Sequence, residues 1–403
     1  MEMLKGFIKG ILGGVAGLLI GFMIAATFVV CLTDMTYSEF FAKFSSLNIS
    51  EGIMAFAVAI FGFVISYIIL IPVHEAGHLV CGLLSGYRFV SFRVLNLTFI
   101  RIDGKLRIKR FSIAGTGGQC LLLSPDLPLG RIPAWWYLFG GVLANLICLF
   151  AALPLLWIKG HPLLTEAVAM FIIADLIIIV MNGIPMKISG AGNDAYNMTK
   201  LKKNPLSKLA LLTTLRTNAL IQNGVRPKDM PGHLFVVPED TDYSNQLEVS
   251  LPLLAASRLI DEMRYPEALE MFEEIYTHKD EIVGIYVKEI ACELLFLRLV
   301  QGDIEGAKQL FDPELRKYIE MYRKVMSSKE RILCAVYLLM DNDREKALAT
   351  YENLHRREND YLLQGEVKSD LALMEALLSD TAPDDSATLS DISIADTATK
   401  TDI

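Results

Sequence analysis

Apolar and polar residues divide the chain into two unlike parts. Long apolar runs dominate up to about residue 186, and charged residues become frequent after that point. A helix needs about 20 apolar residues to cross the hydrocarbon core of a bilayer. Four runs are long enough, and we predict transmembrane helices at 10–31, 52–82, 133–158 and 163–185. The first run is longer than the core of a usual signal peptide, so we expect it to be retained.

The positive charges between these runs predict their orientation. Eight Lys and Arg residues lie between the second and third runs, and four more follow the fourth run closely. The two other loops hold only Lys43 and Lys159. Because cytoplasmic loops are enriched in Lys and Arg, we expect both termini in the cytoplasm. Trp135, Trp136 and Tyr137 open the third run and are typical of an aromatic belt at the membrane interface.

The basic loop between the second and third runs has a strand pattern. In "FRVLNLTFIRIDGKLRIKRFSI" apolar and polar residues alternate on both sides of Asp103–Gly104, a favoured turn pair. We therefore predict a cytoplasmic basic β-hairpin. Either its positive charges only set the orientation of the chain, or the hairpin lies on the anionic inner leaflet, beside the candidate site described next. The glycine-rich stretch at 115–126 is interpreted as a turn or re-entrant segment.

Three ionisable residues interrupt the apolar pattern of the second run. His74, Glu75 and His78 follow 22 uncharged residues, in "YIILIPVHEAGHLVCGLL". Residues four apart lie on one face of a helix, so both imidazoles can bind one zinc ion while Glu75 holds a water molecule. With zinc bound, that water would have a pKa of about 7, and Glu75 would pass its proton to the leaving amine. Chance is the alternative, but ionisable groups inside a membrane helix are functional by default.

A catalytic zinc site needs a third protein ligand. The remaining histidines are poor candidates, because His161 is predicted on the far side of the membrane and the others lie in the soluble half. A carboxylate is therefore expected, and two are available. Asp194 follows the fourth run, whereas Asp175 lies near its middle, too deep to meet His74 unless the helix is broken.

These membrane segments resemble the site-2 protease family of intramembrane zinc metalloproteases. The resemblance covers about residues 52–200. It rests on four short motifs, namely HEAGH at 74–78, Gly141 with Asn145, "NGIP" at 182–185, and the "NDA" that contains Asp194. The chain departs from the family at Ala195, where glycine is usual, and in the longer separation between Pro185 and Asp194.

The resemblance implies a three-helix catalytic core and a set of roles. His74, His78 and Asp194 would bind one zinc ion per chain, and Glu75 would be the base. Asn145 and Asn182 would contact the substrate or its oxyanion. The alternative role for these two asparagines is hydrogen bonding between helices.

The implied function is intramembrane proteolysis by a multi-pass protein of the plasma membrane, most naturally a bacterial one. The substrate would be a membrane-anchored protein or peptide cut within or near the lipid bilayer. One alternative is a catalytically inactive relative that serves as a membrane scaffold and binds a protein partner. A transporter is disfavoured, because the four runs contain no obvious internal repeat. The net charge of −8 argues against nucleic-acid binding.

The soluble half contains three similar segments. "EALEMFEEIY", "EGAKQLFDPE" and "EKALATYENL" each place an alanine four residues before an aromatic residue, with a period of about 39 to 40 residues. The pairs are Ala268 and Phe272, Ala307 and Phe311, and Ala347 and Tyr351. This pattern resembles tetratricopeptide-type helix pairs, which offer surfaces to protein partners, here a cytoplasmic one. An ordinary helical bundle is the alternative.

We therefore predict an α-helical membrane protein with four parts. A membrane zinc metalloprotease domain occupies 1–200, and a linker with some helix occupies 201–248. A tetratricopeptide-like helical repeat domain occupies 249–378. The acidic tail at 379–403 has few large apolar residues and is expected to be disordered.

Overall fold

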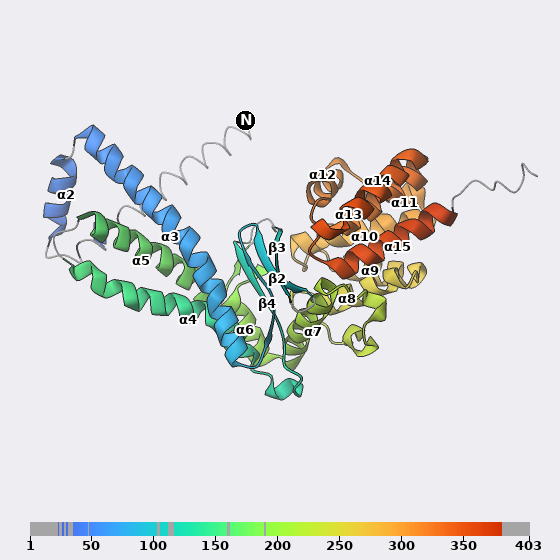
Figure 1. The fold of residues 1–403 in the computed structure, drawn as a ribbon, viewed down its shortest axis with the longest axis horizontal. Coiled ribbons are helices and arrows are strands. Elements are labelled where there is room, and N and C mark those ends of the chain that lie inside the picture. The colour runs from blue at the N-terminus through green and yellow to red at the C-terminus, as the bar shows by residue number, and fades with distance from the viewer. Residues whose placement is uncertain are drawn as a thin grey trace, which may run out of the picture. The chain divides into compact units, whose positions relative to one another are not determined.

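The computed structural model describes residues 23, 26, 27, 30, 35–46, 48–102, 105–111, 117–158, 162–188 and 191–380. Most of these residues are helical, and a small antiparallel sheet lies among the helices (Figure 1). The chain divides into two compact units. The first contains Met1–Leu70 and Asn145–Ile179, and the second contains Ile71–Ala144 and Val180–Ile403. Nearly all of the span predicted at 10–31, and the tail from 381, lie outside the described residues.

Three described helices are long and apolar enough to cross a membrane, as predicted for the second, third and fourth runs. Helix α3 (Ile49–Leu84) contains the candidate span Gly52–Leu84. Helix α4 (Ala134–Ala152) continues into the 3₁₀ turn η2 (Leu153–Trp157), and helix α5 (Pro162–Gly183) follows. A shorter helix, α2 (Tyr37–Ser46), precedes α3. Side chains such as Ile53 and Phe61 are exposed along α3, which suits contact with lipid.

The first unit is held together by apolar contacts among α3, α4 and α5. Leu70, Ala174 and Ile178 form one buried cluster, and Ala152, Val168 and Ile172 form another. Aliphatic side chains carry no hydrogen-bonding groups. They can therefore pack against one another along each helix without leaving a polar atom unpaired. The two clusters therefore join the apolar faces of three long helices.

The sheet belongs to the second unit and has the order β3-β2-β1-β4, antiparallel throughout. Its strands are β1 (Arg88–Val94), β2 (Leu97–Ile102), β3 (Lys105–Arg110) and β4 (Gly118–Leu123). Pairing of β2 with β3 confirms the predicted hairpin. The interpretation of 115–126 as a turn is wrong for Gly118–Leu123. Its apolar residues Cys120, Leu121 and Leu122 are buried against the start of α4 and against α7, which favours a strand.

The chain after α5 forms a short hairpin and two helices before the helical region. Strands β5 (Lys187–Ile188) and β6 (Ala191–Gly192) pair with each other, and α6 (Asp194–Lys203) begins two residues after β6. Helix α7 (Pro205–Gln222) packs on β4 and on the helical region that follows. The 3₁₀ turns η3 (Pro227–Asp229) and η4 (Gly232–Phe235) come next.

The helical region fills most of the sequence after residue 249. It consists of α8 (Ser250–Asp261), α9 (Tyr265–Thr277), α10 (Gly284–Val300), α11 (Ile304–Leu310), α12 (Pro313–Tyr322), α13 (Ser327–Ala335), the π-helical turn η5 (Val336–Met340), α14 (Arg344–Arg356), the 3₁₀ turn η6 (Glu358–Asp360) and α15 (Gln364–Asp380). The three alanines of the repeated segments are fully buried, and their aromatic partners pack on the same cores. Small residues at these places allow neighbouring helices to approach closely.

Candidate metal centre

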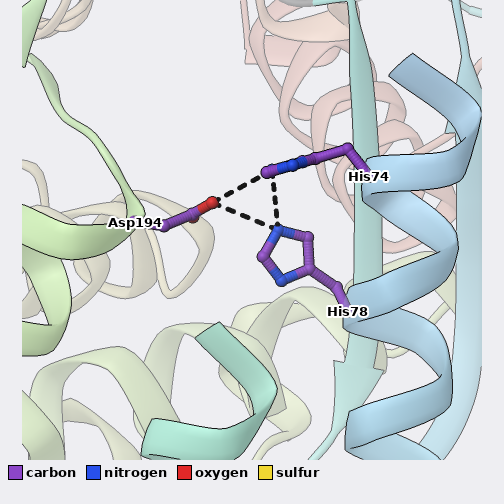
Figure 2. Close-up of side chains that lie close together, drawn as sticks. All are labelled: His74, His78 and Asp194. Atoms are coloured by element: carbon purple, nitrogen blue, oxygen red, sulfur yellow. Dashed lines mark hydrogen bonds and ion pairs between the residues drawn. The ribbon is translucent and has the colours of Figure 1, made fainter. Parts of the chain in front are cut away.

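Three potential metal ligands from two helices meet at one point in the second unit. His74 and His78 lie one turn apart on α3, and Asp194 is the first residue of α6 (Figure 2). Asp194 Oδ2 is 3.1 Å from His74 Nε2 and 3.3 Å from His78 Nε2. The two Nε2 atoms are 3.3 Å apart. The three atoms therefore form a small, nearly equilateral triangle. Both histidines are buried, which limits the access of solvent to it.

The size of this triangle fits a zinc ion. Zinc binds histidine nitrogen and carboxylate oxygen at about 2.0–2.2 Å, and a tetrahedral arrangement of such bonds places any two ligand atoms about 3.3–3.5 Å apart. The separations of 3.1, 3.3 and 3.3 Å come close to that value. Two imidazoles and one carboxylate are also a donor set that zinc accepts, with a fourth position left open. The residues present therefore fit the metal that the sequence predicts.

Hydrogen bonding between neutral side chains does not explain the triangle. The Nδ1–H of His78 donates to the carbonyl oxygen of Tyr137 at 2.8 Å, because a carbonyl can only accept. In a neutral His78 the lone pair of Nε2 then points at Asp194 Oδ2 and at His74 Nε2. Two acceptors would face each other at 3.3 Å without a proton between them. A second proton on His78 or a central metal ion removes this conflict, and a carbonyl partner on the outer nitrogen is the usual support of a metal-binding histidine.

Glycines let α3 and α4 approach closely enough to build the site. A Cβ atom placed on Gly77 would lie 2.1 Å from the carbonyl oxygen of Gly140, and one on Gly140 would lie 2.3 Å from that of Gly77. A Cβ on Gly141 would lie 2.5 Å from His74 Nε2 and 2.6 Å from His78 Nε2. The helices therefore cross backbone to backbone, and Gly141 leaves the space that the two imidazole nitrogens occupy.

Strand β4 lies against the glutamate of the motif. Glu75 is half-buried on α3, and a Cβ on Gly118 would lie 2.5 Å from its Cγ and 2.7 Å from its Oε1. The buried Arg93 of β1 donates through Nη2 to the carbonyl oxygen of Gly118 at 3.1 Å. Tyr137 donates its hydroxyl to the carbonyl oxygen of Cys120 at 2.6 Å. The start of β4 is thus fixed beside Glu75 by contacts from two other elements.

Asn193 fixes the start of the helix that carries Asp194. Its Oδ1 accepts from the backbone N–H of Tyr196 at 2.9 Å, which caps α6. Its Nδ2 donates to the carbonyl oxygens of Met181 and Ile184 at the end of α5. One asparagine therefore joins the end of one helix to the start of the next, and Asp194 projects from the first residue after this junction.

A segment outside the membrane region also supports Asp194. The backbone N–H of Gly192 donates to Gln246 Oε1 at 3.0 Å, and Gln246 Nε2 donates to the carbonyl oxygen of Gly192 at 3.3 Å. The segment around Gln246 is held by the buried Glu248, whose carboxylate accepts hydrogen bonds from four groups. The donors are Asn204 Nδ2, Ser207 Oγ, Asn245 Nδ2 and the N–H of Asp242.

The electrostatics of the site favour an ionised aspartate. Burial opposes the charged form of Asp194, but His78 and His74 more than offset this effect and hold the pKa of Asp194 below its usual range. An ionised carboxylate is the form that binds a metal ion. The carboxylate is therefore ionised, and a metal ion would replace the protons that lie between it and the two histidines.

The remaining predicted site residues are Asp175, Asn145 and Asn182. Asp175 belongs to the first unit and is not a member of the His74, His78 and Asp194 cluster. Asn145 Nδ2 donates to Asp175 Oδ1 at 2.7 Å, and both side chains are fully buried. Asn145 thus has the interhelical hydrogen bond that was the alternative to a substrate role. Asn182 is half-buried near the end of α5.

Tyr137, Asn193 and Gln246 are the supporting residues that sequence reasoning missed. We interpreted Tyr137 as part of an aromatic belt, but it is buried, whereas Trp135 and Trp136 are exposed. An asparagine directly before a helix is a capping signal, so Asn193 could have been found from its place before Asp194. Nothing in the sequence near Gln246 indicates its contact. No family model, curated protein or solved structure matches the chain.

Proposed function

We propose that the chain is an intramembrane zinc metallopeptidase that cuts a membrane-anchored protein or peptide, as the resemblance to the site-2 protease family implies. One observation carries the proposal, namely the triangle of His74, His78 and Asp194, whose edges suit tetrahedral zinc. It is supported by Glu75, which stands beside His74 on the same helix. The open fourth position distinguishes a catalytic from a structural site.

Each residue has a defined task in this proposal. His74, His78 and Asp194 would hold the metal, with Tyr137 orienting His78 through its carbonyl oxygen. When bound, zinc would supply a Lewis acid and a water molecule with a pKa of about 7. Glu75 would accept a proton from the attacking water and deliver it to the leaving nitrogen.

Strand β4 offers a place for the substrate backbone. Among the described strands it pairs only with β1, and its first residue, Gly118, touches Glu75. An extended peptide could add to the other side of β4 through main-chain hydrogen bonds. A transmembrane helix would have to unwind locally before it could bind in this way, which would restrict cleavage to segments with weak helix propensity.

A Glu75→Gln variant tests the proposal, with Glu267→Gln on an exposed part of α9 as its matched control. Zinc content would be measured on detergent-solubilised protein, and turnover on a fluorogenic transmembrane peptide. We expect about one zinc ion per chain in all three proteins. Turnover should fall about 10²–10⁴-fold in Glu75→Gln only. A wild type without zinc, or a Glu75→Gln variant with full activity, would refute the proposal.

The same experiment separates the catalytic proposal from the inactive alternative. A wild type that binds zinc and cleaves neither the peptide nor any protein in a membrane proteome would favour a scaffold. The proposed location is a bacterial plasma membrane with both termini in the cytoplasm, where the helical region could recruit a partner. Labelling of a cysteine introduced at Ser244 from outside intact cells would contradict that orientation.

A further inference from the structure

A cavity of about 260 Å³ lies in the second unit, among α7, α8, α10 and α15. Its apolar lining includes Met230, Phe235, Leu253, Ile260, Phe272 and Leu373. The volume greatly exceeds the roughly 30 Å³ of one water molecule and falls just below the range of about 300–1,000 Å³ typical of small-molecule pockets. The cavity therefore suits one long side chain or a small molecule of similar size.

The rest of the lining carries an excess of negative charge. Glu289, Glu293, Glu366 and Asp370 line it, together with Arg331. Arg331 forms ion pairs of 2.7 Å with both Glu293 and Asp370, and Lys329 forms one of 2.7 Å with Glu289. Four carboxylates thus share two cations. Glu366 is the carboxylate that has no ion pair or hydrogen bond within the described part of the chain.

A second group of the lining also lacks a partner. The Arg331 side chain is only 4% exposed, and its guanidinium stacks on the ring of Phe296 at 4.0 Å. Its Nε and Nη2 donate to Asp370 and Glu293, whereas its buried Nη1 donates to no described atom. Buried polar groups in folded proteins are nearly always hydrogen-bonded, so an unpaired donor at a cavity wall calls for an acceptor from outside.

We propose that this cavity binds the side chain of an arginine or lysine, with the cationic head at Glu366 and the aliphatic stem against the apolar lining. An oxygen of the same ligand, such as the carbonyl next to that side chain, would accept from Arg331 Nη1. The ligand would thus satisfy both unpaired groups. Its source is either a peptide or a free basic amino acid, since both present this chemistry. The inference does not depend on the metal centre.

The protonation of Glu366 supports this assignment. Burial, with the nearby charges of Asp370, Glu289 and Glu293, raises the pKa of Glu366 to about 8, and Lys329 only partly opposes the shift. The vacant carboxyl group therefore holds a proton at neutral pH. A bound cation would displace that proton, because it stabilises the ionised carboxylate. Affinity for the cation should accordingly rise as the pH increases from 6 to 9.

Fluorescence anisotropy on the full-length, detergent-solubilised protein tests the inference. The probe is a fluorescein-labelled peptide with one central arginine, and its partner contains citrulline, a neutral side chain of the same shape. We expect the arginine peptide to bind at least tenfold more tightly. Glu366→Gln should remove this difference, whereas Glu352→Gln, an exposed residue of α14, should preserve it. Thermal unfolding would confirm that both variants are folded.

Competition identifies the source of the ligand. Displacement of the probe by millimolar free arginine, with no further gain from a flanking peptide, would support a free amino acid as ligand. Displacement only by unlabelled arginine peptide would support a peptide partner. Equal binding of the arginine and citrulline peptides would overturn the inference, as would discrimination that survives in Glu366→Gln or absence of binding by all probes.

Discussion

The side-chain amide of Gln246 pairs with the backbone of Gly192 through two hydrogen bonds, one in each direction. The amide thus bonds to Gly192 as the backbone of a neighbouring strand would, and it adds one side chain to the hydrogen bonding of the β5–β6 hairpin. Gly192 lies two residues before Asp194, so Gln246 fixes the backbone that aims a candidate metal ligand. Gln246 lies outside 1–200, the segment in which we predicted the metalloprotease domain.

Replacing Gln246 with alanine should weaken zinc binding about tenfold or more. Outer-shell partners of metal ligands typically contribute 10–100-fold to affinity, and the variant would free the Gly192 backbone before Asp194. Competition with a fluorescent zinc chelator measures the change on solubilised protein. Gln309→Ala, at an exposed position of α11, is the control and should bind zinc like the wild type. An unchanged zinc affinity in Gln246→Ala would show that Asp194 is held without this contact.

The two candidate aspartates should respond differently to the same substitution. Asp194→Asn should lower zinc affinity at least about 100-fold, because a neutral amide replaces an ionised ligand. Asp175→Asn should retain the metal, since Asp175 is not part of the ligand cluster and its amide oxygen can still accept from Asn145. Zinc stoichiometry after dialysis distinguishes them. Loss of zinc in Asp175→Asn with retention in Asp194→Asn would reverse the assignment.

A single methyl group on Gly141 should abolish zinc binding. It would lie 2.5 Å from His74 Nε2 and 2.6 Å from His78 Nε2, far inside normal contact distances, and would separate the two imidazoles. Gly130→Ala is the matched control, because a Cβ atom there meets nothing within 4 Å. Zinc content and thermal unfolding would be measured together. Full zinc occupancy in Gly141→Ala would mean that the histidines do not use their Nε2 atoms as ligands.

Stability should decrease with rising pH through the ionisation of Glu366. Its pKa is raised from 4.5 to about 8 in the folded protein, so the folded state holds a proton that the unfolded state releases. The stabilisation is fully present below pH 4.5 and is lost as the pH rises to about 8. Glu366→Gln should therefore exceed the wild type in stability at pH 9 by about 1–3 kcal/mol, after allowance for solvent access through the cavity.

Thermal unfolding of the solubilised protein between pH 5 and pH 9 measures this effect. The melting temperatures of wild type and Glu366→Gln should approach each other at pH 5, diverge progressively as the pH rises, and keep a constant difference above about pH 8. Glu352→Gln should follow the wild type throughout. Parallel curves for all three proteins would show that Glu366 ionises normally in the folded state.

The membrane helices could be predicted closely because their signal is local. A run of uncharged residues such as 52–73 has one stable outcome in a bilayer, whatever the rest of the chain does. The β2–β3 hairpin could also be predicted from the sequence, because the alternation of apolar and polar residues and the Asp103–Gly104 pair lie within one short stretch. The histidine pair followed from helical periodicity alone. In each case residues close in sequence carry the whole signal.

The remainder of the site depends on contacts between distant segments. The sequence of β4 is typical of a glycine-rich turn. It forms a strand because it pairs with β1 and packs on α7. Tyr137 resembles an interfacial aromatic residue until His78 is seen to donate to its carbonyl oxygen. Gln246 lies more than fifty residues after Asp194, in a stretch that resembles a linker. No periodicity or motif reports such pairings, because they are set by tertiary structure.

The crossing of α3 and α4 at Gly77 and Gly140 has a consequence for how the chain can vary. Where two helices touch through backbone atoms, their separation is set by atoms that every amino acid shares and that have no rotamers. Thermal motion of the surrounding side chains does not alter it, and neither does exchange of one aliphatic residue for another nearby. The exposed surfaces of both helices can therefore change without altering this crossing. At Gly77 and Gly140, by contrast, the hydrogen atom in place of a Cβ must stay as it is.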